Sequence, residues 1–146
     1  MSDKAIKVLS PELCLDLISD LVIDKGGQFI YEQICSVNSE GQKVGPNCYN
    51  WDRVNNCPSC LVGQVMFAWG IPAKWLSEWH ATSAYDLISR INAEPSLDFE
   101  VTRGAAKILG EVQMHQDVSK PWGTALAHGV KVYLEHLAEV NEADED

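Results

Sequence analysis

The residues of this chain that are most able to do chemistry lie in the segment NCPSCLVGQVMFAWGIP, residues 56–72. Cys57 and Cys60 are separated by two residues, as in a zinc knuckle, and thiolates are favoured zinc ligands. A structural zinc site needs four ligands. The chain has no second Cys-x-x-Cys pair, so zinc is one interpretation among several. The further candidate ligands along the chain are Cys48, Cys35 and His80.

A second interpretation is thiol chemistry at the same pair. A cysteine at a helix N-terminus is stabilised as the thiolate by the exposed N–H groups of the first turn. Cys57 would occupy that place if a helix begins at Pro58, and Cys60 would follow one turn later. The redox motif also requires a strand before the pair, whereas WDRVNN (residues 51–56) is typical of a turn. A third interpretation, the start of a buried helix, needs no reaction at either cysteine.

Two tryptophans are the residues most able to anchor a protein partner. Trp75 and Trp79 lie four positions apart in WLSEWH, and residues four apart share one face of a helix. Aromatic side chains carry much of the binding energy of protein interfaces, and the chain has 5 tryptophans in 146 residues. We therefore predict an interface at Trp75, Trp79 and His80, with a packed core position as the alternative for one of the tryptophans.

A polar group in EVQMHQD, residues 111–117, offers a further candidate. Gln113, Gln116 and Asp117 stand at i, i+3 and i+4, so they share one face near the end of a helix. An acid at a helix C-terminus opposes the helix dipole, which indicates a compensating contact. The group is interpreted either as a hydrogen-bond network that fixes the bend before Pro121 or as a polar part of the interface.

Familiar motifs for catalysis are not present in the sequence. The chain has no Gly-x-Ser-x-Gly, no P-loop and no His-Glu-x-x-His. Its histidines are scattered, and His128 lies off the apolar stripe of the last helix, which predicts a solvated side chain. We therefore predict no catalytic residues and, apart from the open question of zinc, no cofactor.

The net charge of −10 limits the classes of partner. Nucleic-acid binding depends largely on Lys and Arg contacts to phosphates, so a conventional DNA or RNA binder is disfavoured. No apolar run reaches the roughly 18 residues of a membrane helix, and the N-terminus does not resemble a signal peptide. We expect a protein of the cytoplasm. An acidic mimic of nucleic acid would use Asp16, Asp20, Asp24 and the C-terminal EADED.

The elements that must position these residues are mainly helices. The pair Ser10–Pro11 favours a helix start and Gly26–Gly27 its end, with apolar residues at helical spacing between them. The run 58–70 has almost no polar position, which predicts the most buried helix. Further helices are expected to begin at Pro72, Ser83, Thr102 and Pro121.

A small β element is expected between the first two helices. Residues 28–37 are rich in aromatic and β-branched residues, as strands are, 38–47 has turn composition, and 48–51 is the expected return strand. Together these elements predict a mainly α fold, a compact bundle of about five helices with one two-stranded β element. Residues 1–140 are predicted to form a single domain and residues 141–146 an acidic flexible tail.

A pattern of residues runs through two segments, NCYNWDRVNNCPSCLVGQVMFAWGIP (47–72) and TRGAAKILGEVQMHQDVSKPWGTALAHGV (102–130). It consists of Cys48, Tyr49, Pro58, Ser59, Cys60, Gly63, Gln113, Gln116, Asp117 and Trp122. Through it the chain resembles small uncharacterised proteins encoded by bacteriophages of actinobacteria. Cys57 departs from this pattern, which weakens the zinc and thiol interpretations. The resemblance favours a buried helix start with Cys60 packed against residues 48–51.

The resemblance implies a phage origin and no particular reaction. Phage genomes encode many small acidic proteins that bind and disable a host protein. We therefore expect an accessory protein that binds and modulates a host protein in the host cytoplasm, in host takeover or anti-defence, without catalysis. The alternatives are an acidic nucleic-acid mimic and a zinc- or thiol-dependent enzyme centred on Cys48, Cys57 and Cys60.

Overall fold

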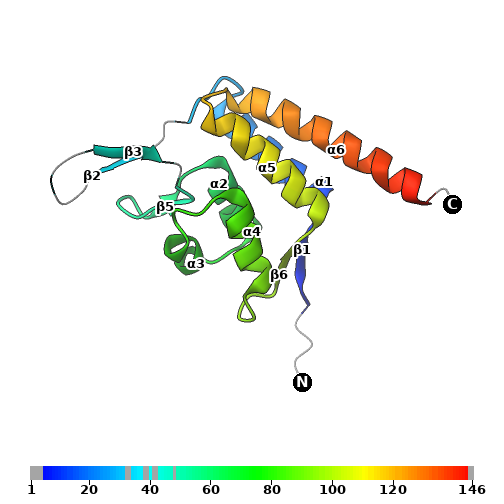
Figure 1. Cartoon of the computed structure of the whole chain (residues 1–146), viewed down its shortest axis with the longest axis horizontal. Helices are drawn as coiled ribbons and strands as arrows, with labels where there is room; N and C mark the ends of the chain where they lie inside the picture. Colours follow the sequence, from blue (N-terminus) through cyan, green and yellow to red (C-terminus); the bar gives the residue numbers. More distant parts are fainter. Residues whose placement is uncertain (1–4, 32–33, 38–39, 41–42, 48, 145–146) are drawn as a thin grey trace.

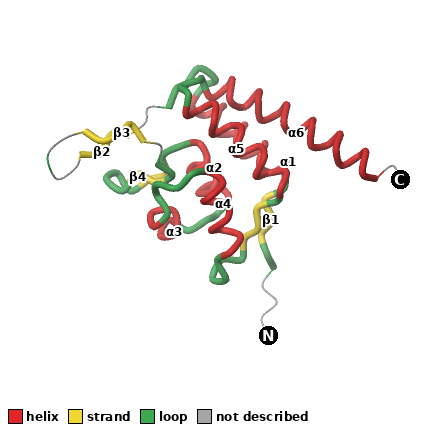
Figure 2. The backbone as a smooth tube through the Cα atoms, viewed as in Figure 1, coloured by secondary structure: helices red, strands yellow, loops and turns green. Residues whose placement is uncertain are grey.

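The computed structural model describes residues 5–31, 34–37, 40, 43–47 and 49–144, and it is mainly helical (Figure 1, Figure 2). Within these residues the helices are α1 (Pro11–Lys25), α2 (Leu61–Trp69), α3 (Ala73–Glu78), α4 (Ala84–Ala93), α5 (Arg103–Asp117) and α6 (Trp122–Asp144). The strands described are β1 (Lys7–Leu9), β2 (Ile34–Val37), β3 (Lys43–Asn47), β4 (Trp51–Asp52), β5 (Cys57–Pro58) and β6 (Phe99–Val101). The predicted mainly α fold is confirmed.

α1, α4 and α5 begin at a hydroxyl side chain, as the sequence predicts. The Oγ of Ser10 accepts a hydrogen bond from the backbone N of Leu13 at 3.1 Å. The side chains of Ser83 and Thr102 accept equivalent bonds in α4 and α5. Such caps satisfy N–H groups that have no partner within the helix. The starts of these helices are therefore fixed locally by their own sequence.

β1 and β6 form a parallel pair that the sequence analysis does not predict. The Oγ1 and the backbone N of Thr102 donate to the carbonyl oxygen of Leu9, at 2.9 and 3.2 Å. Each strand is followed at once by a capping residue and a helix of 15 residues, α1 after β1 and α5 after β6. The pair therefore sets the N-termini of α1 and α5 beside each other.

The β2–β3 hairpin differs from the prediction in its second strand. The return strand is Lys43–Asn47, in the segment predicted as a turn, and it pairs antiparallel with β2. Pro46 is tolerated there because both strands of a two-stranded ribbon are edge strands, where a proline can avoid breaking the ladder. Figure 1 shows the hairpin projecting from the helical body. Residues 32–33, 38–39, 41–42 and 48 lie outside the described residues.

The second hairpin, β4–β5, takes up the end of the segment 48–51, which the sequence predicts as the return strand of the first hairpin. Trp51, the end of the predicted return strand, pairs with Pro58 rather than with β2. The carboxylate of Asp52 accepts hydrogen bonds from the backbone of the turn that follows, so WDRVNN is a closed hairpin. The prediction of a helix start at Pro58 is wrong, because α2 begins at Leu61 with Cys60 as its N-cap.

α2 lies at the centre of the molecule, as predicted, and packs against α1 and α5. A Cβ at Gly63 would overlap the carbonyl oxygen of Asn50, so only glycine allows this contact between α2 and the segment before β4. α6 covers α1 and α5, and these three helices lie together on one side of the molecule, with α2, α3 and α4 on the other (Figure 1). The fully buried side chains of α2 are Leu61, Val62, Val65 and Met66.

α6 has 23 residues and continues to Asp144. It therefore passes through residues 141–144, where the sequence places the start of an acidic flexible tail. In the described part of the chain, no helix is both long and apolar enough to span a membrane.

Candidate functional site

The structure does not assemble the predicted zinc ligands that it describes. Cys57 is exposed on β5, Cys60 is fully buried at the N-terminus of α2, and His80 lies partly buried after α3. In the described residues, these three side chains form no group whose ligand atoms could share a metal ion. Cys48 lies outside the described residues, as does the side chain of Cys35. Cys57 is also not at a helix N-terminus, which removes the helix-based argument for a reactive thiol there.

Cys60 caps α2 with its sulfur atom. The Sγ accepts a hydrogen bond from the backbone N of Gly63 and donates one to Oδ1 of Asn50, both at 3.4 Å. The backbone N of Cys60 donates to the carbonyl oxygen of Tyr49 at 2.9 Å. The expected packing of a buried Cys60 against residues 48–51 is therefore confirmed for the described residues.

Asn50 joins the segments around Cys60, a role that the sequence analysis does not predict. The Nδ2 of Asn50 lies 3.0 Å from the carbonyl oxygens of Trp79 and Thr82. Its backbone N donates to the carbonyl oxygen of His80 at 2.7 Å. The residue is 2% exposed, so this amide holds the connection between α3 and α4 against the start of α2. Its partners are backbone atoms, which leave no signature in the sequence.

The predicted tryptophan pair is not an exposed interface. Trp79 is 7% exposed and belongs to the core, so its assignment as a surface anchor is wrong. Trp75 is partly buried, with its ring centroid 5.1 Å from that of Trp79 and the Lys74 ammonium 4.8 Å from its ring. His80 stacks on Tyr49 with ring centroids 5.5 Å apart, and burial lowers its pKa. This face of α3 therefore serves packing.

The polar group on α5 forms a hydrogen-bond network, as one of its two interpretations expects, and this network reaches the start of α2. Gln116 is 1% exposed, and its Oε1 accepts a hydrogen bond from the backbone N of Leu61 at 2.7 Å. The Nε2 atoms of Gln116 and Gln113 donate to Oδ1 of Asp117 at 3.1 and 2.9 Å. Gln116 therefore caps α2 from a neighbouring helix and does not belong to an accessible surface, whereas Gln113 and Asp117 line a pocket.

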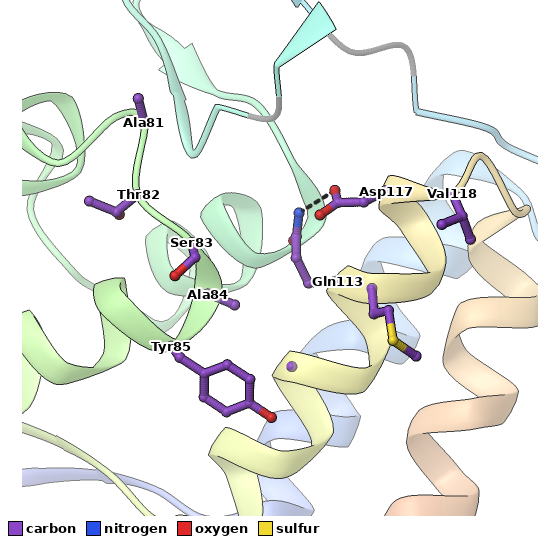
Figure 3. A pocket seen from close by; sticks show the side chains of 10 residues that line it. Ala81, Thr82, Ser83, Ala84, Tyr85, Gln113, Asp117 and Val118 are labelled. Carbon is purple, nitrogen blue, oxygen red and sulfur yellow. Dashed lines mark hydrogen bonds between the residues drawn. The ribbon is translucent and has the colours of Figure 1, made fainter.

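This pocket lies between the start of α4 and the C-terminal half of α5, and we call it the α4–α5 groove. Its volume is about 370 Å³. In Figure 3 the Tyr85 ring stands on the α4 side, with Gln113 and Asp117 on the α5 side. Tyr85, Met114 and Val118 are 58%, 51% and 61% exposed. The remaining lining residues are Ala81, Thr82, Ser83, Ala84 and Gly110.

The apolar side chains of the groove lie off the buried stripe of α5, which consists of Ala105, Ile108, Leu109 and Val112. Met114 and Val118 stand four residues apart, so they share a second, exposed face. The phenol group of Tyr85 packs directly on Gly110, and a Cβ at position 110 would overlap that group. The spacing of Met114 and Val118 is the sequence signal that could have identified this surface.

A second group of polar side chains lies where α5 faces α6. Nε2 of His115 is 3.1 Å from Oε1 of Glu111, and the ring of His128 stacks on that of His115 with centroids 3.6 Å apart. His128 is thus partly exposed and partly packed, so the prediction of a solvated side chain holds only in part. Burial, with smaller contributions from His115 and Lys120, lowers the pKa of His128. Among the described residues, Glu111, His115 and His128 form the group whose ligand atoms could hold a metal ion.

Comparison of the chain with protein-family models, with curated proteins and with solved structures gave no match.

Proposed function

We propose that the protein acts by binding another protein through the α4–α5 groove, without turning over a substrate there. The observation that supports this most is the gathering of Tyr85, Met114 and Val118 around one pocket, each more than half exposed. Exposed apolar side chains that surround a hollow and have polar residues beside them are typical of protein-binding surfaces. The polar residues here are Gln113 and Asp117.

The groove fits one large apolar side chain of the partner. A volume of about 370 Å³ is near the lower end of ligand-binding pockets. Met114 is unbranched and polarisable, so it adapts to the shape of an inserted side chain. Tyr85 offers an aromatic face and a hydroxyl, a combination that is frequent in interface anchors. A partner with an exposed aromatic or long aliphatic residue would therefore complete the groove.

The partner should carry basic residues beside that apolar side chain. The chain has a net charge of −10. Asp86, next to Tyr85, and Asp117, on the α5 side of the groove, are both exposed. Opposite charges around an apolar contact speed association and select the partner more than they add affinity. The rate of association should therefore fall as the salt concentration rises.

The proposed partner is a host protein in the bacterial cytoplasm, bound in host takeover or anti-defence. This part of the proposal rests on the resemblance to small phage proteins. Several residues of that pattern have structural roles, since Gly63 contacts Asn50 and Cys60 and Gln116 cap α2. The pattern therefore supports a shared fold more than a shared reaction, which agrees with a binding function.

The two alternative functions have less support. For a zinc- or thiol-dependent enzyme, Cys60 is buried in a cap, and Cys57 is exposed on β5 and not at a helix N-terminus that would stabilise its thiolate. For a nucleic-acid mimic, the exposed acids of α1 are Asp16, Asp20 and Asp24. These form one short stripe, much less than a duplex presents along its phosphates.

The test is affinity capture from a lysate of an actinobacterial host with three baits. The baits are the wild-type chain, Met114→Lys and the matched control Leu134→Lys. Met114 and Leu134 are 51% and 58% exposed on helices, and lysine is a good helix former, so both variants should fold. We expect wild type and Leu134→Lys to retain one basic partner, and Met114→Lys to lose it, because a lysine in the groove repels that partner.

The unfolding temperatures of the baits should agree, which excludes loss of the fold as the cause. Equal capture by all three baits would show that the partner binds elsewhere. Loss of capture in both variants would indicate a nonspecific effect of added positive charge, and would also contradict binding through the groove.

A further inference from the structure

We infer that Glu111, His115 and His128 bind a divalent transition-metal cation, with zinc as the best match, and that the metal ties α5 to α6. This site is separate from the α4–α5 groove and from the cysteines that the sequence makes conspicuous. It does not depend on the proposed partner binding.

The ligands come from two facing helices. Glu111 and His115 stand at i and i+4 on α5, so their side chains share one face, and His128 meets them from α6. Nε2 of His115 and Oε1 of Glu111 are 3.1 Å apart. Two tetrahedral zinc ligands, each about 2.0–2.1 Å from the metal, are about 3.3 Å apart. One edge of the required tetrahedron is therefore already present.

The third ligand, His128, must rotate out of its stacked position, because the nitrogen lone pairs of two nearly parallel rings do not point at one metal. The ligand atoms of the three residues all lie within 4.8 Å of one another. Glu111 and His128 are partly buried, which leaves their side chains room to rotate, whereas His115 is buried and fixed. Shifts on the order of 1–2 Å bring the atoms to the spacing of a tetrahedral site.

The burial of His115 calls for an explanation. The residue is 7% exposed, and its Nδ1 is buried with no hydrogen-bond partner in the described part of the chain. This atom does not by itself indicate a metal, because the ligand atom that faces Glu111 is Nε2, and His80 and His136 also have a buried Nδ1 without a partner among the described residues. The metal is favoured by the convergence of His115, Glu111 and His128 from two helices. The competing explanation is that His115 and His128 simply pack α5 against α6 as stacked neutral rings.

The ligand chemistry selects the metal. Two imidazole nitrogens and one carboxylate oxygen suit Zn²⁺, whereas Mg²⁺ and Ca²⁺ prefer shells of oxygen ligands. Three protein ligands leave one coordination position for water. His128 also borders a separate pocket of about 440 Å³, lined in part by Thr124 and Lys131. Lys120 and Lys131 act electrostatically on His128, so we expect moderate affinity.

The test is titration of the untagged full chain with Zn²⁺ alone, in competition with a colorimetric chelator and with thermal unfolding as a second readout. We expect one zinc per chain and a rise in the unfolding temperature on saturation, because the metal binds the folded state. His128→Ala and Glu111→Gln should each weaken binding at least about tenfold. Both side chains are partly buried, so these variants should fold. The matched control is His136→Ala, also on α6 but outside the group.

Zinc binding that is equal in wild type, His128→Ala and Glu111→Gln would overturn the inference. So would an equal loss in the His136→Ala control. A further variant, Cys57→Ser, identifies zinc held by the exposed thiol: binding that disappears in Cys57→Ser and persists in His128→Ala would place the metal at the cysteines. No measurable binding at all would leave the stacked histidines as a packing contact and would also overturn the inference.

Discussion

At the scale of single residues, the first turn of α2 is held by side chains from outside its own helix. The backbone N–H of Leu61 donates to Gln116 on α5, and that of Gly63 donates to Cys60 at the N-cap. An N-terminus buried without such partners would leave these donors unpaired, at a cost of about 1–3 kcal/mol each. Asn50 then fixes Cys60 in place. These polar residues are explained by stability.

This assignment predicts the order in which the cysteines react. A thiol reagent applied to the native protein should modify exposed Cys57 well before Cys60 and Cys14, which are both fully buried. The raised pKa of Cys14, about 12, slows it further, because the thiolate is the reactive form. The measurement is peptide mass mapping after timed labelling, with denatured protein as the control. Equally fast labelling of Cys60 and Cys57 would show that the cap is open to solvent.

At the scale of elements, the helices could be predicted because their start signals are local. Ser83 and Thr102 accept hydrogen bonds from their own first turns, so a short window of sequence contains the whole cause. β6 could not be predicted, because its 3 residues are stabilised by pairing with β1 at the other end of the chain. The start of α2 could not be predicted for the same reason, since Pro58 pairs with Trp51 in a hairpin.

The residues of the candidate sites could likewise be predicted only where the contact between them is local. Gln113 and Asp117 can be predicted to lie together because they share one turn of one helix. Tyr85 could not be assigned to the same surface, because it reaches α5 only through the packing of α4 beside it. His128 likewise needs the contact between α5 and α6. Sequence reasoning therefore identified the polar half of the groove and missed its apolar half.

The central position of α2 predicts a large loss of stability on truncation. Leu61→Ala should lower the free energy of unfolding by about 2–4 kcal/mol, because the side chain is fully buried and leaves a cavity. Leu134→Ala, at a position 58% exposed on α6, is the matched control and should cost less than about 1 kcal/mol. The measurement is urea unfolding of both variants. Similar losses in the two variants would show that α2 is not central.

At the scale of the whole molecule, α5 connects the separate features. One face caps α2 through Gln116, another lines the groove with Met114, and a third meets α6 through His115. The groove lies on α4 and α5, two helices of the packed body, rather than on the projecting β2–β3 hairpin (Figure 1). A preformed apolar surface of this kind loses little conformational entropy on binding, which favours a partner-binding role.

The most direct test of that role is site-specific photo-crosslinking. A benzophenone amino acid placed at position 114 should crosslink one basic host protein in an actinobacterial lysate, because Met114 borders the groove. The same amino acid at position 134, exposed on α6, should not crosslink that protein. Excess unlabelled wild-type chain should compete with the crosslink, which separates specific docking from chance collision. A partner that crosslinks equally from both positions, or from position 134 alone, would contradict binding through the α4–α5 groove.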